Sequence, residues 1–380
     1  MKEVGKIKDA CIVIAGQSPK GSSYNENREG LEFHQGKKAF GESIIEHSNV
    51  WTTEITKIAE PGDILMSVRA PVGPTNITDR KICIGRGLAA IRCKGNIIPQ
   101  YILYALRNIE SRIIGNDGAV FNSINKKQIE DLPLPLLPLS EQQSIVDYLD
   151  SAFAKIDAMK ANAEKALNES KALFQASLKE MLEPKEGWVT STLKDECFKI
   201  TDGTHQTPKY FQTGYIFLSS KNVTTRKIDW INVKFIDESQ HQIMHKRVAP
   251  KVGDILLAKN GTTGVAAMVD RDVVFDIYVS LALLRSKGNV TPDYLLAFVN
   301  SPIAKEQFNK RLIGMGVPNL HLGEINKVVI TYPIDKEEQA KVTKKIEELD
   351  YQIIRLQENY DKISQECDAL KQAILRQVFE

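Results

Sequence analysis

The sequence predicts a mixed α/β (α+β) fold: two similar globular lobes separated by two long antiparallel helices that form an intramolecular coiled coil. Two observations predict it. The stretches 140–183 and 337–380 carry apolar residues at alternating steps of four and three, the pattern of a coiled coil with a period of 3.5. Segments of the first half of the chain also recur in the second half in the same order. The chain therefore has the plan of a pseudo-twofold tandem repeat: lobe, helix, lobe, helix.

The two predicted helices share one apolar seam. Its positions are Ile145, Leu149, Ile156, Met159 and Leu173 in the first helix and Val342, Ile346, Leu349, Ile353, Leu356, Tyr360, Ile363, Leu370 and Ile374 in the second. Two unrelated amphipathic helices on separate cores are the alternative. A register shared along both helices favours helices that pack on each other.

The repeat sets the expected domain bounds. They are 1–139 for lobe one, 140–183 for the first helix, 184–336 for lobe two and 337–380 for the second helix. Gly62-Asp63-Ile64-Leu65 recurs as Gly253-Asp254-Ile255-Leu256. Residues 20–56 and 204–248 diverge almost completely, as expected of related binders with different targets. Neutral drift of surface loops would leave the same pattern.

The elements of lobe one follow from local signals, and lobe two repeats several of them. Proline is tolerated in the first turn of a helix and excluded from its interior, which places one helix from Pro99 to about Ile113 and makes the proline-rich strap Leu132–Pro138 extended. The remaining predictions are a strand or short helix at Ile7–Ile14, a turn-rich loop at Gly16–Gly21, and strands at Ile64–Val68, Lys81–Ile84 and Ala89–Ile91.

The composition is that of an ordinary globular protein. The chain has 380 residues, 42% of them hydrophobic, and a net charge of +2. Both lobes are mildly basic and both helices mildly acidic, which suits lobes that meet phosphate. The five cysteines form no C-x-x-C pair, which predicts reduced thiols in a cytoplasmic protein. No apolar run approaches a membrane span, and the N-terminal residues lack the apolar core of a signal peptide.

One ordered series of motifs is found twice. Gly62–Gly73 is followed by Cys83–Gly87, a proline strap, and Glu141-Gln142-Gln143 at the start of a long helix. This duplicated series resembles the specificity subunit of type I restriction–modification systems, and the resemblance covers essentially the whole chain. Lobe two departs from it at Lys259–Gly264, where lobe one has Arg69–Gly73.

The resemblance implies a non-catalytic subunit that confers DNA sequence specificity. Each lobe would be a target recognition domain that reads one half of a bipartite, asymmetric site in double-stranded DNA. The expected partners are two adenine methyltransferase (modification) subunits and motor-nuclease (restriction) subunits. Those partners would use S-adenosylmethionine, ATP and Mg²⁺, and this chain would need no cofactor of its own. Helices of about 40 residues, about 60 Å long, would set the distance between half-sites.

Candidate DNA contacts are loop residues that can pair with bases or phosphates. In lobe one they are Gln17, Lys20, Tyr24, Asn25, His34, Gln35, Lys37, Lys38, Arg69 and Arg86. In lobe two they are His205, Lys209, Tyr210, Lys221, Asn222, Arg226, Lys259 and Asn260. For any one of them, an ordinary solvated side chain is the alternative reading.

Motifs for catalysis are missing from the sequence. It contains no phosphate-binding G-x-x-x-x-G-K-[ST] loop and no G-x-S-x-G nucleophile elbow. His241 and His245 have a metal-compatible helical spacing, but no third ligand is evident nearby in the sequence, which favours a plain helix face and no metal. Two other functions stay open: a coiled-coil scaffold or adaptor whose lobes bind protein, and a degenerate DNA-modifying enzyme. Salt-sensitive DNA binding would argue against the first, and S-adenosylmethionine or metal binding would favour the second.

Overall fold

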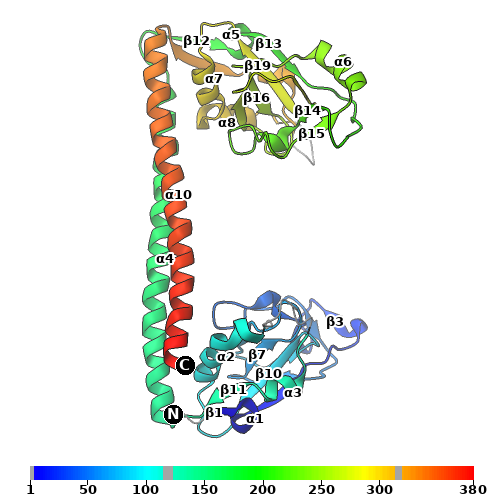
Figure 1. Ribbon diagram of the computed structural model, residues 1–380, viewed down its shortest axis with the longest axis vertical. Coiled ribbons are helices and arrows are strands. Elements are labelled where there is room, and N and C mark those ends of the chain that lie inside the picture. The colour runs from blue at the N-terminus through cyan, green and yellow to red at the C-terminus, as the bar shows by residue number, and fades with distance from the viewer. Residues whose placement is uncertain (1–3, 114–122, 313–318) are drawn as a thin grey trace. The chain divides into compact units, whose positions relative to one another are not determined.

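The structure, a computed structural model, describes residues 4–113, 123–312 and 319–380. It divides into two compact units, one made of Met1–Ala163 with Asp361–Glu380 and the other of Glu164–Tyr360. Each unit holds one lobe and the adjoining parts of two long helices, α4 (Leu139–Leu182) and α10 (Lys336–Phe379), which pack side by side (Figure 1). The mixed α/β fold with paired long helices is confirmed.

A four-stranded antiparallel sheet is the scaffold of lobe one. Its strand order is β2-β10-β7-β8, and helix α2 packs against β7 and β8. The sequence Ile7–Ile14, expected to be a strand or a short helix, contains both, since α1 leads directly into β2. The bounds are α1 Ile7–Ala10, β2 Cys11–Ala15, β7 Ile64–Ser67, β8 Thr75–Ile77, β10 Leu88–Cys93 and α2 Pro99–Ile113.

Lobe two repeats this scaffold strand for strand. Its sheet has the order β13-β19-β16-β17, again antiparallel, with α7 on β16 and β17. The register is also repeated: Ile64 pairs with Ile77 in lobe one, and Ile255 pairs with Met268 in lobe two. The bounds are β13 Cys197–Asp202, β16 Ile255–Ala258, β17 Ala266–Met268, β19 Leu281–Ser286 and α7 Pro292–Val299.

Each lobe carries a second sheet, and here the lobes differ. Lobe one has five strands in the order β3-β5-β4-β9-β6, and lobe two has three in the order β15-β14-β18. Both contain one parallel pair, β4–β9 and β14–β18 respectively. The bounds are β3 Tyr24–Asn25, β4 Leu31–His34, β5 Trp51–Thr52, β6 Ile58–Ala59, β9 Ile82–Ile84, β14 Tyr215–Leu218, β15 Lys234–Ile236 and β18 Phe275–Ile277.

Short elements complete both lobes. The helix α6 (Glu238–Arg247) packs beside β18, and α8 (Pro302–Asn309) follows α7. The others are α3 Lys126–Glu130, α5 Leu193–Glu196, α9 Leu322–Ile325 and the 3₁₀ helices Gly21–Ser23, Lys37–Ala39 and Ser220–Asn222.

A two-stranded ribbon joins each lobe to its long helix. In lobe one β1 (Val4–Lys6) pairs with β11 (Pro133–Pro135), so the proline strap is extended as expected. In lobe two β12 (Trp188–Thr192) pairs with β20 (Val329–Pro333). A tyrosine hydroxyl holds each strap from the scaffold helix: Tyr101 donates to Pro135 O at 2.8 Å and Tyr294 to Thr331 O at 2.9 Å.

One buried glutamine anchors the start of each long helix. Gln142 Oε1 accepts a hydrogen bond from Ile98 N at 3.0 Å, and its Nε2 donates to Leu137 O at 2.8 Å. Gln339 makes the equivalent bonds to Thr291 N and to the carbonyl oxygens of Asn289 and Pro333. We call these two residues the glutamine anchors.

The predicted seam of α4 is correct at Leu149 and Ile156 and displaced by one residue at its other positions. Leu149 and Ile156 are buried as expected, but Met159 and Leu173 are 60% and 69% exposed. Their neighbours Leu167, Phe174 and Leu178 are buried instead. The buried residues Val146, Phe153, Leu167 and Phe174 are separated by multiples of seven, so the seam keeps a period of 3.5 and passes one residue after Ile145, Met159 and Leu173.

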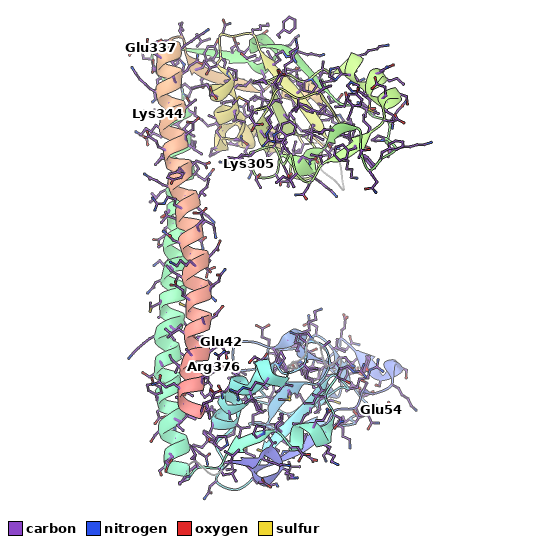
Figure 2. The ribbon with its side chains drawn as sticks, viewed as in Figure 1. Glu42, Glu54, Lys305, Glu337, Lys344 and Arg376 are labelled. Atoms are coloured by element: carbon purple, nitrogen blue, oxygen red, sulfur yellow. The ribbon has the colours of Figure 1, made fainter. Side chains whose placement is uncertain are left out.

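The seam of α10 follows the prediction more closely. Ile346 is buried, and Val342, Leu349, Ile353, Tyr360, Ile363 and Ile374 are half-buried. Leu356 and Leu370, however, are 41% and 48% exposed. Gln357 and Lys371 point inward in their place and bond to α4, Lys371 to Asp157 and Gln357 to Lys171. Side chains cover both helices along their length, and Glu42 of lobe one, which pairs with Lys371, lies near Arg376 (Figure 2).

In the described part of the chain, no helix combines the length and the apolar character needed to span a membrane. All five cysteines are free thiols.

Candidate nucleic-acid interface

Both lobes present one equivalent loop where their two sheets meet. Gly16 N donates to Leu88 O at 2.9 Å, and Gly203 N donates to Leu281 O at 3.4 Å. A Cβ at Gly16 would lie 2.2 Å from Gly85 O, and one at Gly203 would lie 1.9 Å from Ile277 O. Only glycine lets the backbone approach so closely, so the scaffold dictates where the residues after each glycine emerge.

In lobe one, several predicted contacts gather around this loop. Ser18 Oγ donates to Gln35 Oε1 at 2.9 Å and accepts from Arg86 N at 3.2 Å. Tyr24 donates its hydroxyl to Pro19 O and stacks on Phe33 with ring centroids 4.9 Å apart. The structure thus brings together five exposed residues, which we call the lobe-one loop cluster: Gln17, Lys20, Tyr24, Gln35 and Arg86.

Three more predicted contacts of lobe one are also exposed: Lys37, Lys38 and Arg69. Lys37 and Lys38 form the 3₁₀ turn after β4, and Arg69 follows Val68, whose N–H donates to Gly87 O at 3.0 Å. Asn25 has a structural role in the described residues. Its side-chain amide bonds to both the N–H and the carbonyl of Glu29, and so closes a turn.

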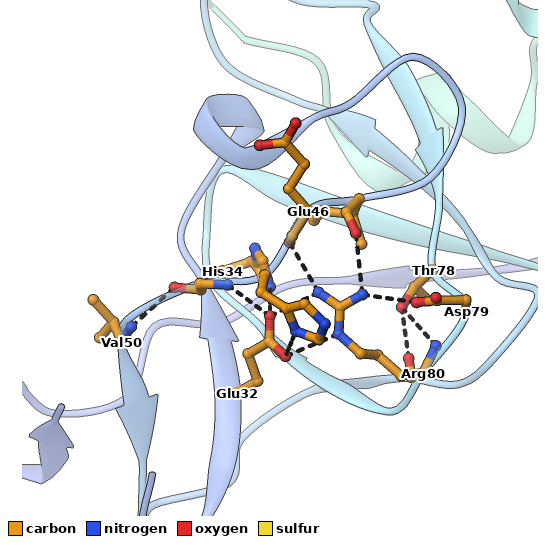
Figure 3. A network of polar contacts seen from close by, with 10 residues as sticks. Glu32, His34, Glu46, Val50, Thr78, Asp79 and Arg80 are labelled. Atoms are coloured by element: carbon orange, nitrogen blue, oxygen red, sulfur yellow. Dashed lines mark hydrogen bonds and ion pairs between the residues drawn. The ribbon is translucent and has the colours of Figure 1, made fainter. Parts of the chain in front are cut away.

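A buried ion-pair network fastens the second sheet of lobe one. Glu32, 3% exposed, accepts two bonds of 2.8 Å from the Arg80 guanidinium and one of 2.8 Å from Ser48 N. His34 Nε2 lies 2.8 Å from Glu32 Oε1, and His47 contacts the other oxygen (Figure 3). Burial alone would raise the pKa of Glu32, but these hydrogen bonds outweigh it and hold the pKa well below its usual range. His34 was expected to contact DNA, but it is buried in this network.

Residues that the sequence reading missed line a cavity beside this network. Arg28, Asn49, Trp51 and Lys81 surround a volume of about 710 Å³ together with Arg80. Cationic, amide and aromatic side chains in one hollow are suited to a base and its phosphate. No sequence signal pointed to Arg28, Asn49 and Trp51, because they lie in the segment 20–56 that diverges between the lobes.

Lobe two uses a different buried network under its equivalent loop. Asp202, 2% exposed, accepts 2.7 Å bonds from Lys259 Nζ and Arg247 Nη2, and His205 contacts the same carboxylate at 3.3 Å. Burial alone would raise the pKa of Asp202, but the contacts with Lys259 and Arg247 outweigh it and hold the pKa below its usual range. Lys259 was expected to reach DNA, but it is 4% exposed and neutralises Asp202.

Three other predicted contacts of lobe two have internal partners. Asn222, 7% exposed, caps a turn by bonds to Ser219 N and Asn232 O. Arg226 is half-buried and pairs with Asp350 of α10 at 3.3 Å. Half-buried Asn260 bridges to Asn319, and its side-chain oxygen finds no partner among the described residues. The side chains of Asn222 and Arg226 therefore have structural partners, and Asn260 is held through its backbone.

The remaining predicted contacts of lobe two are exposed. They are His205, Lys209, Tyr210 and Lys221. Gln240 of α6 fixes the backbone of Lys209 on both sides, by accepting from its N–H at 2.9 Å and donating to its carbonyl at 3.1 Å. Lys234, which the sequence reading missed, places its ammonium 3.9 Å from the Tyr210 ring centroid. Exposed lysines beside an aromatic ring are typical of surfaces that bind nucleic acid.

Comparison with known proteins decides the family. The model described as type I restriction modification DNA specificity domain matches residues 2–169 and again 185–365. The chain belongs to this family. Two specificity domains in tandem agree with the duplicated scaffold, and the resemblance seen in the motifs is confirmed.

Curated relatives of the specificity family differ in how much they share with this chain. A putative type I restriction enzyme MjaX specificity subunit from Methanocaldococcus jannaschii is 40% identical over 169 residues, which is 44% of this chain and 39% of the relative. The EcoKI specificity subunit of Escherichia coli is 23% identical over 281 residues, 69% of this chain and 60% of the relative. The chain thus matches less than two thirds of either relative.

Solved structures of specificity subunits share the fold. A chain from a study of complex assembly and conformational transition of the type I R-M system aligns over 100% of this chain and 97% of its own length, with a TM-score of 0.76 and 16% identity. The HsdS subunit from Thermoanaerobacter tengcongensis aligns over 99% and 96%, with a TM-score of 0.56 and 16% identity.

Proposed function

We propose that this chain reads a bipartite, asymmetric site in double-stranded DNA, one half-site with each lobe, and performs no catalysis itself. The carrying observation is the contrast between the two sheets of each lobe. The scaffold sheets repeat in strand order and register, while the second sheets differ in strand number and in their buried networks. One way of presenting loops, combined with two different loop surfaces, is what two different half-sites require.

The DNA-facing residues in this proposal are the exposed ones. Lobe one would use the lobe-one loop cluster with Lys37, Lys38 and Arg69, and lobe two would use His205, Lys209, Tyr210 and Lys221. Lysines would mainly hold phosphates, and glutamine and arginine side chains can pair with adenine and guanine edges. The cavity lined by Arg28 and Trp51 would add contacts in lobe one.

The long helices would dock the partner subunits. Large apolar side chains are exposed on them away from the seam: Tyr148, Met159, Leu173 and Tyr351 are 52%, 60%, 69% and 62% exposed. Exposed apolar side chains on an otherwise charged helix surface fit a protein interface. We assign this surface to adenine methyltransferase subunits, with restriction subunits joining the assembly. S-adenosylmethionine, ATP and Mg²⁺ would be bound by those partners.

Methylation mapping tests the proposal directly. The chain is co-expressed with its candidate methyltransferase, and the host DNA is sequenced for modified adenines. We expect a split motif with a fixed gap that appears only when this chain is present. A chain in which residues 17–56 carry the insert of a related lobe should change one half of the motif and leave the other unchanged.

Three outcomes would contradict the proposal. An active methyltransferase that modifies the same adenines without this chain would remove the specificity role. A lobe-one exchange that alters both halves of the motif would contradict the assignment of one half-site to each lobe. Metal-dependent cleavage or methylation by the purified chain alone would favour a DNA-modifying enzyme.

A further inference from the structure

Three potential metal ligands meet in the second sheet of lobe two. His241 and His245 are one turn apart on α6, and Asp276 lies on β18. His241 Nδ1 lies 2.7 Å from Asp276 Oδ2, and His245 Nδ1 lies 3.3 Å from Asp276 Oδ1. One ligand atom from each residue falls within 4.8 Å of the other two. The sequence could not show the third ligand, because parallel pairing of β14 and β18 brings Asp276 to α6 from 31 residues away.

The groups bonded to Asp276 distinguish it from four other buried carboxylates. Asp276 is 1% exposed, and its bonded partners are two imidazoles. Glu32, Asp63, Asp202 and Asp254 are equally buried, but each contacts an arginine or lysine. Among the described residues, Asp276 has no bonded arginine or lysine, and a bound cation would compensate its buried charge.

The ring positions are also constrained. His241 stacks on Tyr215, with ring centroids 3.8 Å apart and planes 8° apart, and its side chain is 11% exposed. Bonds of about 2.0–2.1 Å to a tetrahedral zinc ion place ligand atoms about 3.3–3.4 Å apart. The present spacings of 2.7 and 3.3 Å are therefore within a small side-chain adjustment of a metal-binding arrangement.

We propose that His241, His245 and Asp276 bind a divalent transition-metal ion of the zinc class. Two imidazoles and one carboxylate match the nitrogen and oxygen ligands that zinc accepts, whereas Mg²⁺ and Ca²⁺ prefer oxygen alone. The ion would neutralise Asp276 and fasten α6 to β18. Because Gln240 of α6 holds the backbone of Lys209, the ion would also fix the loop that carries Lys209 and Tyr210. This last consequence rests on the proposed function, but the metal site does not.

Metal binding is measured on the full chain without DNA. The protein is stripped with a chelator, titrated with Zn²⁺ against a chromophoric chelator, and analysed for bound metal after gel filtration. We expect one equivalent of Zn²⁺, a rise in Tm with Zn²⁺ but not with Mg²⁺, and a visible absorption band when Co²⁺ is used instead. His245→Gln and Asp276→Asn should each weaken Zn²⁺ binding by at least about 100-fold, since loss of an outer partner alone costs up to about that much.

The chain offers a matched control. It has six histidines, and the double variant His205→Gln/His321→Gln removes two others from the same lobe. This control should keep one equivalent and the full Zn²⁺-dependent rise in Tm. His245 has a side chain 31% exposed, so His245→Gln should fold, which circular dichroism without metal would verify. The site is ruled out if the native chain binds no Zn²⁺, or if the control loses as much affinity as His245→Gln. Failure of the DNA proposal would leave these readings unchanged.

Discussion

Each lobe contains a network around a buried carboxylate: Glu32 lies in the second sheet of lobe one, and Asp202 lies at the end of a scaffold strand of lobe two. Glu32 joins β4 to the segment around Arg80, whereas Asp202 joins β13 to Lys259 and Arg247. Each network lies directly behind exposed candidate DNA contacts. A buried residue that does not contact DNA can therefore fix the positions of the residues that do contact it. Substitutions in these two networks are the first test of this role.

Glu32→Gln should lower the free energy of unfolding of lobe one by about 2–3 kcal/mol. The neutral amide cannot balance Arg80, and breaking a buried pair on one side costs about 3–5 kcal/mol, less here because Arg80 is 21% exposed. Urea denaturation followed by tryptophan fluorescence measures the loss. Glu26→Gln, on an exposed neighbour, is the control and should change the stability by less than about 0.5 kcal/mol. Equal stabilities of the two variants would contradict the role of this network.

The same pair predicts a pH dependence. The folded-state pKa of Glu32 lies below its unfolded value of about 4.3, so its contribution is fully present above that value and is lost as the pH falls through the folded pKa. The stability difference between the native chain and Glu32→Gln should therefore be constant from about pH 6 to pH 8 and should shrink below about pH 4. A difference that grows in acid would reverse the expected sign.

The lysines at the turn after β4 give a prediction on binding. Lys37→Ala/Lys38→Ala should weaken DNA binding by the assembled methyltransferase and reduce the slope of log K against log salt by about two, one for each lost phosphate contact. Fluorescence anisotropy at several salt concentrations measures the slope. Lys126→Ala/Lys127→Ala on α3 is the matched pair in the same lobe and should leave the slope unchanged. An unchanged slope in the Lys37/Lys38 variant would place these residues away from phosphate.

At the scale of elements, the glutamine anchors connect each lobe to its long helix. Gln142 is 1% exposed and bonds to Ile98 N and Leu137 O. Gln142→Ala leaves both backbone groups unpaired and should cost about 2–4 kcal/mol, because each buried unsatisfied group costs about 1–3 kcal/mol. Gln143→Ala, one residue on and exposed, should cost less than about 0.5 kcal/mol. Chemical denaturation of both variants compares them, and similar losses would rule out an anchoring role.

Some helices and strands could be predicted from the sequence, and others could not. Helix α2 begins and ends where its proline signal and apolar pattern placed it, and the scaffold repeat was visible because buried strands leave a local motif. The seam has the predicted period, but Met159 and Leu173 were misplaced by one residue. Leu173 stands beside the equally apolar Phe174, and the periodic pattern alone does not decide which of the two is buried. In the second sheets only β9 was predicted, as the strand Lys81–Ile84. The other strands were missed, because they have two to four residues, pair across long loops and carry no periodic signal.

The candidate site was predictable only in part for a related reason. Polarity in a loop identified Gln17, Lys20 and Lys209, which are exposed. Polarity alone could not distinguish these exposed residues from Lys259 and His34, which are buried. Lys259 pairs with Asp202, 57 residues away, and His34 with Glu32, 2 residues away. A charged residue becomes structural through a contact that only the folded chain creates. The reverse error hid Trp51 and Arg28, which line a cavity formed by three separate segments.

At the scale of the whole molecule, the continuous helices predict a spacing rule. The pairs Lys160–Asp368 and Lys171–Gln357 flank residues 164–170 of α4 and 358–364 of α10. Deleting both heptads should shorten the helices by about 10 Å at 1.5 Å per residue, which is about three base pairs of DNA. Methylation mapping should then show the two half-sites closer by about that number. A variant that assembles and methylates with the original gap would exclude the helices as the spacer.

The first unit is built from two separate parts of the chain, and this affects how it folds during synthesis. Tyr101 of α2 packs on Phe379, with ring centroids 5.5 Å apart, and Arg112 pairs with Glu380. A ribosome therefore releases lobe one long before the helical segment that covers Leu149, Phe153 and Ile156 exists. Lobe two has no such delay, since its helix partners lie within residues 164–360. Prematurely terminated chains would expose an apolar stripe to proteases, so a cell would tend to keep only chains that carry both recognition lobes.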